Sequence, residues 1–362
     1  NAIIPVLIVP YYSVIGGWVV KYLFEYIRGN GSKLAEDGYF SGFISNGGAT
    51  EICFVIFCMF TLVIIYAGVQ NGIERVSKIM MPILVVLSVI IAIYSVTRPG
   101  AIEGVKYFLV PNVKNFSWMT VVAAMGQMFY SLSIAMGILV TFGSYMRKDT
   151  SIEDSTRNVE IFDTAIAMMA GLMIIPAVFA FSGGDPDTLQ AGPSLMFITI
   201  PKVFANMGFG TAVGILFFVL VLFAAVTSSI ALTESAVSTF EDELGWGRKK
   251  ATVLTGVIMI TLGTLSCLGY GPLDFVKIIG MQFLDFFDFL TNSVMMPIAA
   301  LMTSLLVSRV IGVDKIEEEI RHGESAFRRK KIFVVMIKYL CPIFALIILA
   351  SSVANAFGWI AM

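Results

Sequence analysis

Charged and metal-binding side chains are scarce in this sequence of 362 residues. Only 14% of the residues are Asp, Glu, Lys or Arg, and His322 is the single histidine. The four cysteines fall within apolar runs and show no spacing typical of a metal site or a disulfide framework; they are Cys53, Cys58, Cys267 and Cys341. The sequence therefore argues against an enzyme that uses histidine, a bound metal or paired cysteines in its apolar segments. A net charge of −1 likewise predicts no nucleic-acid partner.

Apolar runs, in contrast, occupy most of the chain. Hydrophobic residues make up 57% of the sequence, and the mean hydropathy is +0.87. The runs are continuous rather than alternating, and each reaches the roughly 20 residues that cross a bilayer as a helix. We therefore predict an all-α polytopic membrane protein with about nine transmembrane helices. They lie near residues 2–27, 51–71, 76–97, 118–145, 159–183, 209–240, 251–270, 279–308 and 332–360.

Lys and Arg residues predict the orientation, because basic residues that flank spans are retained in the cytoplasm. Alternate connections carry most of them: Arg75, Lys78, Arg147, Lys148, Arg157, Arg248, Lys249, Lys250 and the segment 309–331. The other connections hold Arg28, Lys33, Arg98, Lys106, Lys114 and Lys202. The first group is expected to be cytoplasmic, which places residue 1 inside and residue 362 outside.

The run "GQMFYSLSIAMG", residues 126–137, carries polar side chains inside a predicted span. Gln127, Ser131 and Ser133 are followed by Gly137, and a glycine allows a membrane helix to break. The carbonyls and amides of a broken helix can hold an ion and the charged head of a ligand. Close packing between helices is an alternative reading, because serine and glycine also mediate such contacts.

A second polar group lies in "LFAAVTSSIAL", residues 222–232. Ala224, Thr227 and Ser228 are spaced i, i+3 and i+4, so that they share one helical face. Hydroxyl and carbonyl oxygens suit a monovalent cation better than a divalent one, which would favour more carboxylates. Hydroxyls bonded back to their own helix are the alternative.

Acidic residues within spans form a third signal. Asp163 lies in "IFDTAIAMMAG", and Asp285 and Asp288 lie in "FLDFFDFLTNS". An intramembrane carboxylate costs at least about 2.5–3.5 kcal/mol, so it usually faces a cavity and serves a function. A position near the start of its span would also let Asp163 reach interfacial water.

Five motifs together resemble the neurotransmitter:sodium symporter family, and within it the bacterial amino-acid transporters related to the leucine transporter. They are "PYYSVIGGW" (10–18), "GQMFYSLSIAMG" (126–137), "SYMRKD" (144–149), "LMFITIP" (195–201) and "TSSIA…FEDEL" (227–244). The resemblance implies an inverted-repeat, broken-helix fold in a bacterial or archaeal cell membrane. It also implies sodium-coupled symport of an amino acid by alternating access.

The resemblance implies roles for particular residues. The substrate pocket would be lined by Ile8, Tyr12, Tyr130, Ser131, Ser133, Met136, Ser228 and Leu232. One sodium site would use Ser131 and Asp163, and a second would use Ala224, Thr227 and Ser228. Tyr12 and Tyr130 would close the pocket from outside, with Asp288 in an outer latch, and Tyr145 and Asp242 would belong to an inner latch.

The extent of the chain, its ion dependence and its substrate follow from the same resemblance. Residues 1–362 are expected to form one transmembrane domain that aligns with family helices three to eleven and lacks the first two, so that it would not transport alone. Asp163, with Ala167 four residues later, would replace the charge of a chloride ion, so two sodium ions and no chloride are expected. Met136 suits a hydrophobic amino acid. A proton-coupled transporter and a non-transporting amino-acid sensor of the same fold stay open as alternatives.

Overall fold

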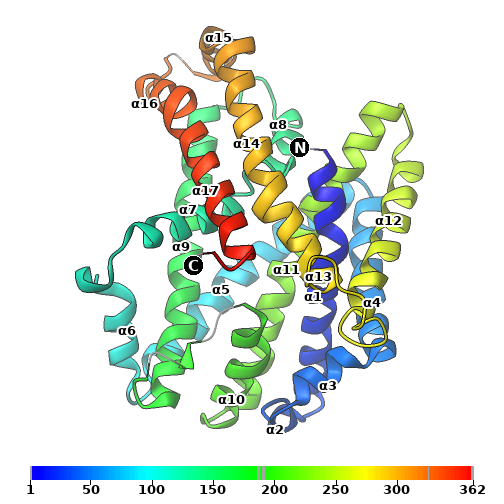
Figure 1. Cartoon of the computed structure of the whole chain (residues 1–362), viewed down its shortest axis with the longest axis vertical. Helices are drawn as coiled ribbons and strands as arrows, with labels where there is room; N and C mark the ends of the chain where they lie inside the picture. The colour runs from blue at the N-terminus through cyan, green and yellow to red at the C-terminus, as the bar shows by residue number, and fades with distance from the viewer. Residues whose placement is uncertain (1, 186–187, 190–191, 325, 360–362) are drawn as a thin grey trace.

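The computed structural model describes residues 2–185, 188–189, 192–324 and 326–359, and nearly all of its regular structure is helical. Figure 1 shows the arrangement of the elements. The α-helices are α1 (Ile3–Ile27), α2 (Gly31–Leu34), α3 (Tyr39–Ser45), α4 (Gly47–Tyr66), α5 (Arg75–Val96), α6 (Ala101–Leu109), α7 (Trp118–Ser131), α8 (Ile138–Ser144), α9 (Ile152–Ser182), α10 (Ile200–Ala205), α11 (Gly210–Leu244), α12 (Arg248–Leu268), α13 (Phe283–Asp288), α14 (Met296–Leu305), α15 (Val313–Gly323), α16 (Lys330–Val335) and α17 (Cys341–Ala356). π-Helical segments are η1 (Val69–Glu74), η4 (Leu195–Thr199), η5 (Phe289–Met295), η6 (Leu306–Ile311) and η7 (Met336–Leu340), and η2 (Val113–Asn115) is a 3₁₀ turn.

Eight stretches of the described residues are long and apolar enough to cross a membrane. They are Ile3–Ile27, Gly47–Tyr66, Val69–Val96, Ile152–Ser182, Gly210–Leu244, Arg248–Leu268, Phe283–Ile311 and Lys330–Ala356. The ninth predicted span, 118–145, is divided into α7 and α8, and neither piece is long enough to cross alone. The all-α transmembrane fold predicted from the sequence is therefore confirmed, and the difference in number comes from one broken helix.

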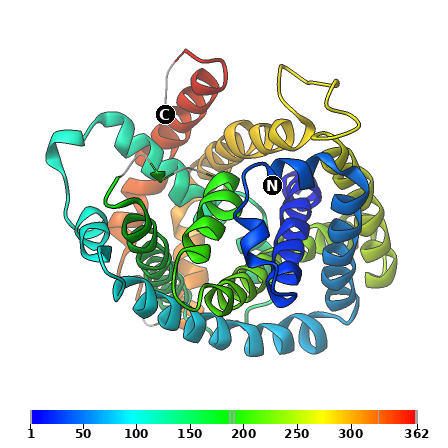
Figure 2. The ribbon, with the colours of Figure 1, turned by 90° about the horizontal axis from the view of Figure 1, so that it is seen from below.

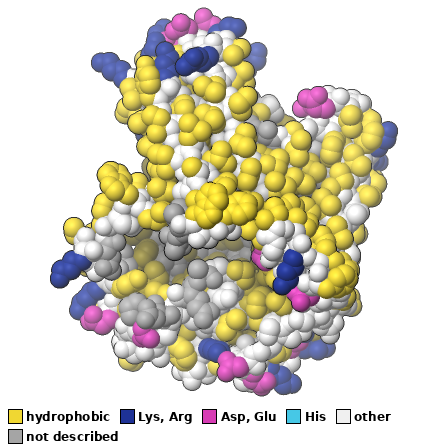
Figure 3. Space-filling model, viewed as in Figure 1, with side chains coloured by type: hydrophobic (Ala, Val, Ile, Leu, Met, Phe, Trp, Pro, Cys, Tyr) yellow, Lys and Arg dark blue, Asp and Glu magenta, His cyan; other side chains and the backbone are white. Residues whose placement is uncertain are grey.

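The surface fits a membrane environment. Figure 3 shows hydrophobic side chains over the middle of the visible face, with most basic and acidic side chains towards the two ends. In Figure 1, α15 and the turn from α11 to α12 lie at the upper end, whereas α2, α3, α6 and α10 lie at the lower end. The connections whose basic residues predict a cytoplasmic location thus meet at the same end, as the orientation requires.

The centre of the fold is α1: 67% of its 18 most apolar consecutive residues are buried, against 11% for Lys330–Ala356. Helix α1 packs against α4, α11 and α12, which surround it in the view of Figure 2. Gly16 and Gly17 permit the approach of α4, because an added Cβ would lie 2.5 Å from the Phe57 ring and 2.6 Å from the backbone nitrogen of Phe54. On the other side, Tyr22 donates a hydrogen bond to the carbonyl of Phe197 at 2.8 Å.

Candidate functional site

The predicted helix break lies between α7 and α8. Helix α7 begins with a capping box formed by Ser117 and Thr120 and ends at Ser131; the next α-helix, α8, begins at Ile138. Three residues of the link have positive φ angles: Ser133 at 53°, Ala135 at 64° and Gly137 at 79°. Only the glycine adopts that region without strain. The backbone of Ser133 and Ala135 is therefore strained, as is common at functional sites.

A cavity of about 350 Å³ lies against this break. Helix α11 supplies Thr227, Ser228, Ala231 and Leu232, and α1 supplies Tyr12. The remaining lining residues are Met81, Tyr130, Ser131, Ser133, Met136 and Ile138. Every residue predicted for the substrate pocket except Ile8 therefore lines one cavity. Ile8 lies one turn before Tyr12 on α1 and is fully buried.

The first predicted sodium pair is in direct contact. The Ser131 hydroxyl donates to Oδ1 of Asp163 at 2.6 Å, which joins the end of α7 to the interior of α9. Asp163 is the twelfth residue of the 31-residue helix α9, because this helix begins at Ile152, seven residues earlier than the sequence suggested. The carboxylate is therefore deeper in its helix than expected and is partly buried.

The second predicted sodium group has its hydroxyl turned to its own helix. Thr227 Oγ1 donates to the carbonyls of Phe223 and Ala224, both at 3.0 Å. Thr227 and Ser228 line the cavity, whereas Ala224 does not; the Ala224 carbonyl lies 3.0 Å from the Thr227 hydroxyl. These residues offer oxygen atoms that suit a sodium ion. The hydrogen bonds of Thr227 to its own helix are also found in helices that bind no ion.

On the outer side, a polar cluster joins α1 to α13 and η5. Asn292 donates to Asp288 at 2.6 Å, and the hydroxyls of Tyr11 and Thr291 lie 3.2 Å apart. Asn292 also approaches the Tyr11 hydroxyl at 3.4 Å. Asn292 therefore orients Asp288 from one helical turn away and connects it to Tyr11 of α1.

On the inner side, Tyr145 donates to Oε1 of Glu234 at 2.7 Å rather than to Asp242. Glu234 is fully buried and forms two hydrogen bonds with Arg248, at 3.0 and 2.6 Å. Arg248 also donates to the carbonyl of Ile65 at 3.0 Å. This network joins α4, α8, α11 and α12, whereas Asp242 is exposed on the last turn of α11.

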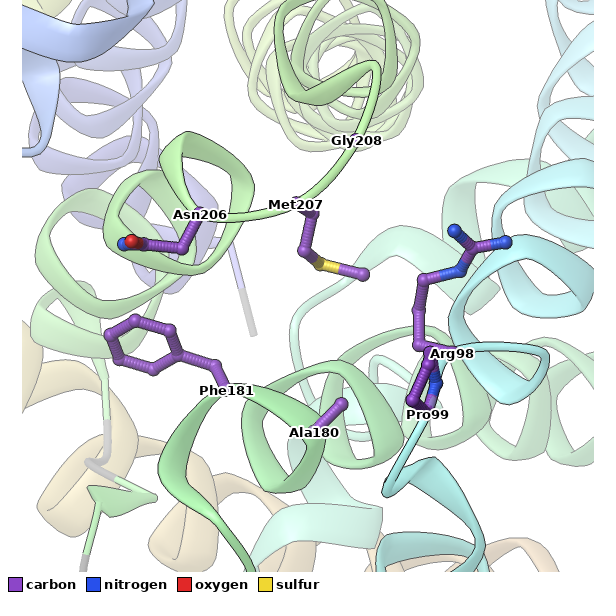
Figure 4. Close-up of a pocket in the computed structure, with 7 residues that line it drawn as sticks. All are labelled: Arg98, Pro99, Ala180, Phe181, Asn206, Met207 and Gly208. Carbon is purple, nitrogen blue, oxygen red and sulfur yellow. The ribbon is translucent and has the colours of Figure 1, made fainter.

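A second cavity, of about 410 Å³, opens at the opposite end of the molecule between α5, α9 and the turn from α10 to α11 (Figure 4). Arg98 and Met207 face each other across it, and Phe181 lies on the far side. The Arg98 guanidinium lies 4.3 Å from the Tyr94 ring centre and donates to the Tyr94 carbonyl. None of the predicted site residues lines this cavity, so we assign the site to the break between α7 and α8.

Several site residues were not predicted from the sequence. Ala231 follows Thr227 by four residues and could have been found from the shared helical face. Glu234, a carboxylate in the same apolar span, was a signal of the same kind as Asp163 and was overlooked. Met81 gave no signal, because it is one apolar residue among many in α5.

The comparisons with known proteins agree with this geometry. The profile of the sodium:neurotransmitter symporter family matches residues 39–358. An uncharacterised sodium-dependent transporter of Bacillus subtilis, YhdH, is 36% identical over 88% of this chain and 71% of its own length. One from Haemophilus influenzae is 32% identical over 95% of this chain and 76% of its own.

More distant and structural relatives extend the picture. The sodium- and chloride-dependent glycine transporter 2 of Xenopus laevis is 25% identical over 74% of this chain and 34% of its own length. The crystal structure of MhsT in complex with L-phenylalanine superimposes with a TM-score of 0.83 at 35% identity, covering 97% of this chain and 79% of that one. This multi-pass membrane protein belongs to the sodium:neurotransmitter symporter family.

Proposed function

We propose that this protein couples the entry of a hydrophobic amino acid to sodium by alternating access. The observation that carries the proposal is the cavity between the helix break and α11, which gathers Tyr12, Tyr130, Ser131 and Ser228 in one place. Its volume of about 350 Å³ lies at the small end of the range for small-molecule sites, roughly 300–1,000 Å³. A single amino acid suits such a space.

The chemistry of the lining supports a hydrophobic side chain in the substrate. Met81, Met136, Ile138 and Leu232 contribute apolar groups, and the two methionines adapt to irregular shapes. MhsT, a relative of 35% identity, has been crystallised with phenylalanine. Both lines of support point to a medium or large apolar amino acid.

Two sodium ions would be carried with the substrate. Ser131 and Asp163 offer a hydroxyl and a carboxylate that already touch, and Ala224, Thr227 and Ser228 offer neutral oxygens on α11. Each sodium ion that moves down a tenfold gradient and 100 mV releases about 1.4 plus 2.3 kcal/mol, so that two release about 7 kcal/mol. That is enough to concentrate a zwitterion on the order of ten-thousand-fold or more.

Chloride would not be needed. Asp163 brings a fixed negative charge next to the first sodium group, and Ala167, one turn later, has no hydroxyl to bind an anion. The glycine transporter among the relatives is named as chloride-dependent, so ion use varies within the family. That the chain corresponds to family helices three to eleven remains a prediction.

The inner and outer ends of the cavity would open in turn. Tyr12 and Tyr130 would close the outer side, with the Asp288 cluster above them. The Tyr145, Glu234 and Arg248 network would close the inner side, with Asp242 exposed beside it for a further partner.

The test is uptake of radiolabelled amino acids by the full-length protein in proteoliposomes, with external sodium or potassium and with or without chloride. We expect sodium-dependent, chloride-independent accumulation of one hydrophobic amino acid. Thr227→Ala should raise the half-saturating sodium concentration at least tenfold, and Asp163→Asn should make uptake chloride-dependent. Thr261→Ala removes a similar back-bonded hydroxyl on α12 and should change nothing. Equal uptake in sodium and potassium would favour a proton-coupled transporter, and binding without accumulation would favour a sensor.

A further inference from the structure

An apolar groove of about 350 Å³ runs along the outer surface between α4 and α12, away from the transport cavity. Its walls are Met59, Val63 and Tyr66 on α4 and Val253 and Val257 on α12, each of which is at least half exposed. Both helices are long and apolar enough to span a membrane, so these exposed side chains lie at the depth of the bilayer. The groove is therefore accessible to lipid along its length.

Small residues of α12 form the floor of the groove. Thr252 and Gly256 lie one helical turn apart on α12 and line its base. A Cβ added at Gly256 would lie 3.1 Å from Cδ1 of Leu62, so a larger residue would press on the opposite wall. Gly256 therefore lets α12 lie close to Leu62 of α4 at the base of the groove.

Two lysines lie at the cytoplasmic end of this groove. The Lys249 ammonium sits 5.7 Å from the centre of the Tyr66 ring, which is a groove wall. The Lys250 ammonium sits 3.7 Å from the centre of the Trp246 ring. Both lysines are exposed, and neither forms an ion pair within the described part of the chain, whereas the neighbouring Arg248 is bound to Glu234 and Glu241. Exposed basic side chains at the end of a membrane helix attract anionic headgroups.

Thr252 supplies an independent indication of a ligand. Its side chain is 3% exposed, and its hydroxyl oxygen has no hydrogen-bond partner among the described residues. It lies three residues after Lys249, or about 4.5 Å deeper along the helix. The ester oxygens of a phospholipid lie just below its phosphate, so they would reach this hydroxyl.

The length of the groove also matches a lipid. From Lys249 to Ile260, the deepest groove residue on α12, there are eleven residues, which span about 16 Å. Half of the hydrocarbon core of a bilayer is about 15 Å thick. One acyl chain of the inner leaflet would fill the groove from the surface to the midplane.

We propose that the groove between α4 and α12 binds one anionic phospholipid of the inner leaflet. Lys249 and Lys250 hold the phosphate, Thr252 donates to an ester oxygen, and one acyl chain lies along Gly256 towards Ile260. The bound lipid adjoins Arg248, whose side chain ties α12 to α4 and α11, so the site stabilises the inner end of these helices.

The test is native mass spectrometry of the full-length protein after delipidation, with phosphatidylglycerol or phosphatidylcholine of identical acyl chains. One phosphatidylglycerol should bind at least tenfold more tightly than phosphatidylcholine. Lys249→Gln with Lys250→Gln should abolish this preference. Thr252→Val should weaken binding about threefold to tenfold, the loss of one hydrogen bond. Val253→Trp, at a position 61% exposed, should fill the groove and prevent binding of both lipids.

Matched controls distinguish this lipid site from a free-anion site and from a protein interface. Lys315→Gln with Lys331→Gln removes the same charge from exposed positions of the cytoplasmic segment and should leave the preference intact. An unchanged preference in the Lys249 and Lys250 variant would overturn the proposal. So would displacement of the lipid by inorganic phosphate with no effect of Val253→Trp, which would indicate a free-anion site. A change of oligomeric state in Val253→Trp without loss of lipid would indicate an interface between two copies and would also overturn it.

Discussion

The transport cavity has two walls of different construction. Helix α11 is continuous for 35 residues and is extensively buried, whereas α7 contains no buried residue and is separated from α8 by a non-helical link. The Thr227 hydroxyl of α11 bonds to its own helix, but Ser131 at the end of α7 reaches across to α9. One wall is thus fixed by packing, and the other by a small number of polar contacts. This difference is what a cavity needs if one side is to move while the other keeps its shape.

The largest expected effect breaks the fixed wall at its inner end. Arg248→Leu leaves Glu234 buried without its cation, and the free energy of unfolding should fall by about 3–5 kcal/mol. Thermal unfolding in detergent measures the loss. Glu234→Leu combined with Arg248→Leu should recover most of the stability, since no buried charge is then left alone. Arg147→Leu, which breaks an exposed pair with Asp149, should cost less than about 1 kcal/mol. A double variant as unstable as the single one would contradict the assignment.

The polar contact of the broken wall should be measurable as a coupling. A double-mutant cycle with Ser131→Ala and Asp163→Ala should give an interaction energy of about 1.5–3 kcal/mol, the range for a hydrogen bond to a charged group. The readout is the free energy of unfolding of the four proteins in the absence of sodium. Thr164 lies next to Asp163, but its hydroxyl bonds to the Glu160 carbonyl, so Ser131→Ala and Thr164→Ala should be additive. Additivity in the Asp163 cycle would mean that the Ser131–Asp163 contact does not stabilise the broken wall.

Substitution of one glycine near each wall tests how tightly that wall is packed. Gly17→Ala places a Cβ 2.6 Å from the backbone of Phe54, behind the fixed wall, and should cost about 1–3 kcal/mol. Gly126→Ala, in α7, meets nothing within 4 Å and should be neutral or slightly stabilising through helix propensity. The unfolding temperatures of the two variants measure this difference. Equal decreases in unfolding temperature would show that the two walls are packed alike.

The smallest expected effect concerns the strained link. Ala135 has a φ of 64°, which costs a non-glycine residue about 1–2 kcal/mol, and glycine loses about 0.4–1 kcal/mol to chain entropy. Ala135→Gly should therefore raise the unfolding free energy by up to about 1 kcal/mol. Ala123→Gly, within α7, should lower it by about 0.5–1 kcal/mol. The same sign for both changes would show that the link is not strained.

The spans and the helix break could be predicted from residue patterns, whereas the contacts between helices could not. Continuous apolar runs predict spans well, and Gly137 after several polar residues predicted the break. The lining of the cavity was expected from the resemblance to the family rather than from residue patterns alone. The resemblance also put Ile8 in the pocket, but Ile8 is not among the residues that line this cavity, and Met81 lines it from a helix with no distinguishing residue. The partner of Tyr145 could not be deduced, because Glu234 and Asp242 are both acidic and lie two turns apart on α11; only the packing shows which one faces α8.

The inner network has a consequence for the timing of opening. Glu234 and Arg248 belong to α11 and α12, and Ile65 belongs to α4, so their bonds stay intact when α8 moves away. Within this network only the Tyr145 hydroxyl has to leave its carboxylate; outside it, Thr141 of α8 also gives up its contacts with Ser235 and Ser238 of α11. A bond of this kind contributes about 1.5–3 kcal/mol, which corresponds to a factor of about 10 to 150 in a rate. Tyr145 would therefore affect how long the inner side stays closed, whereas Glu234 and Arg248 stabilise the fold.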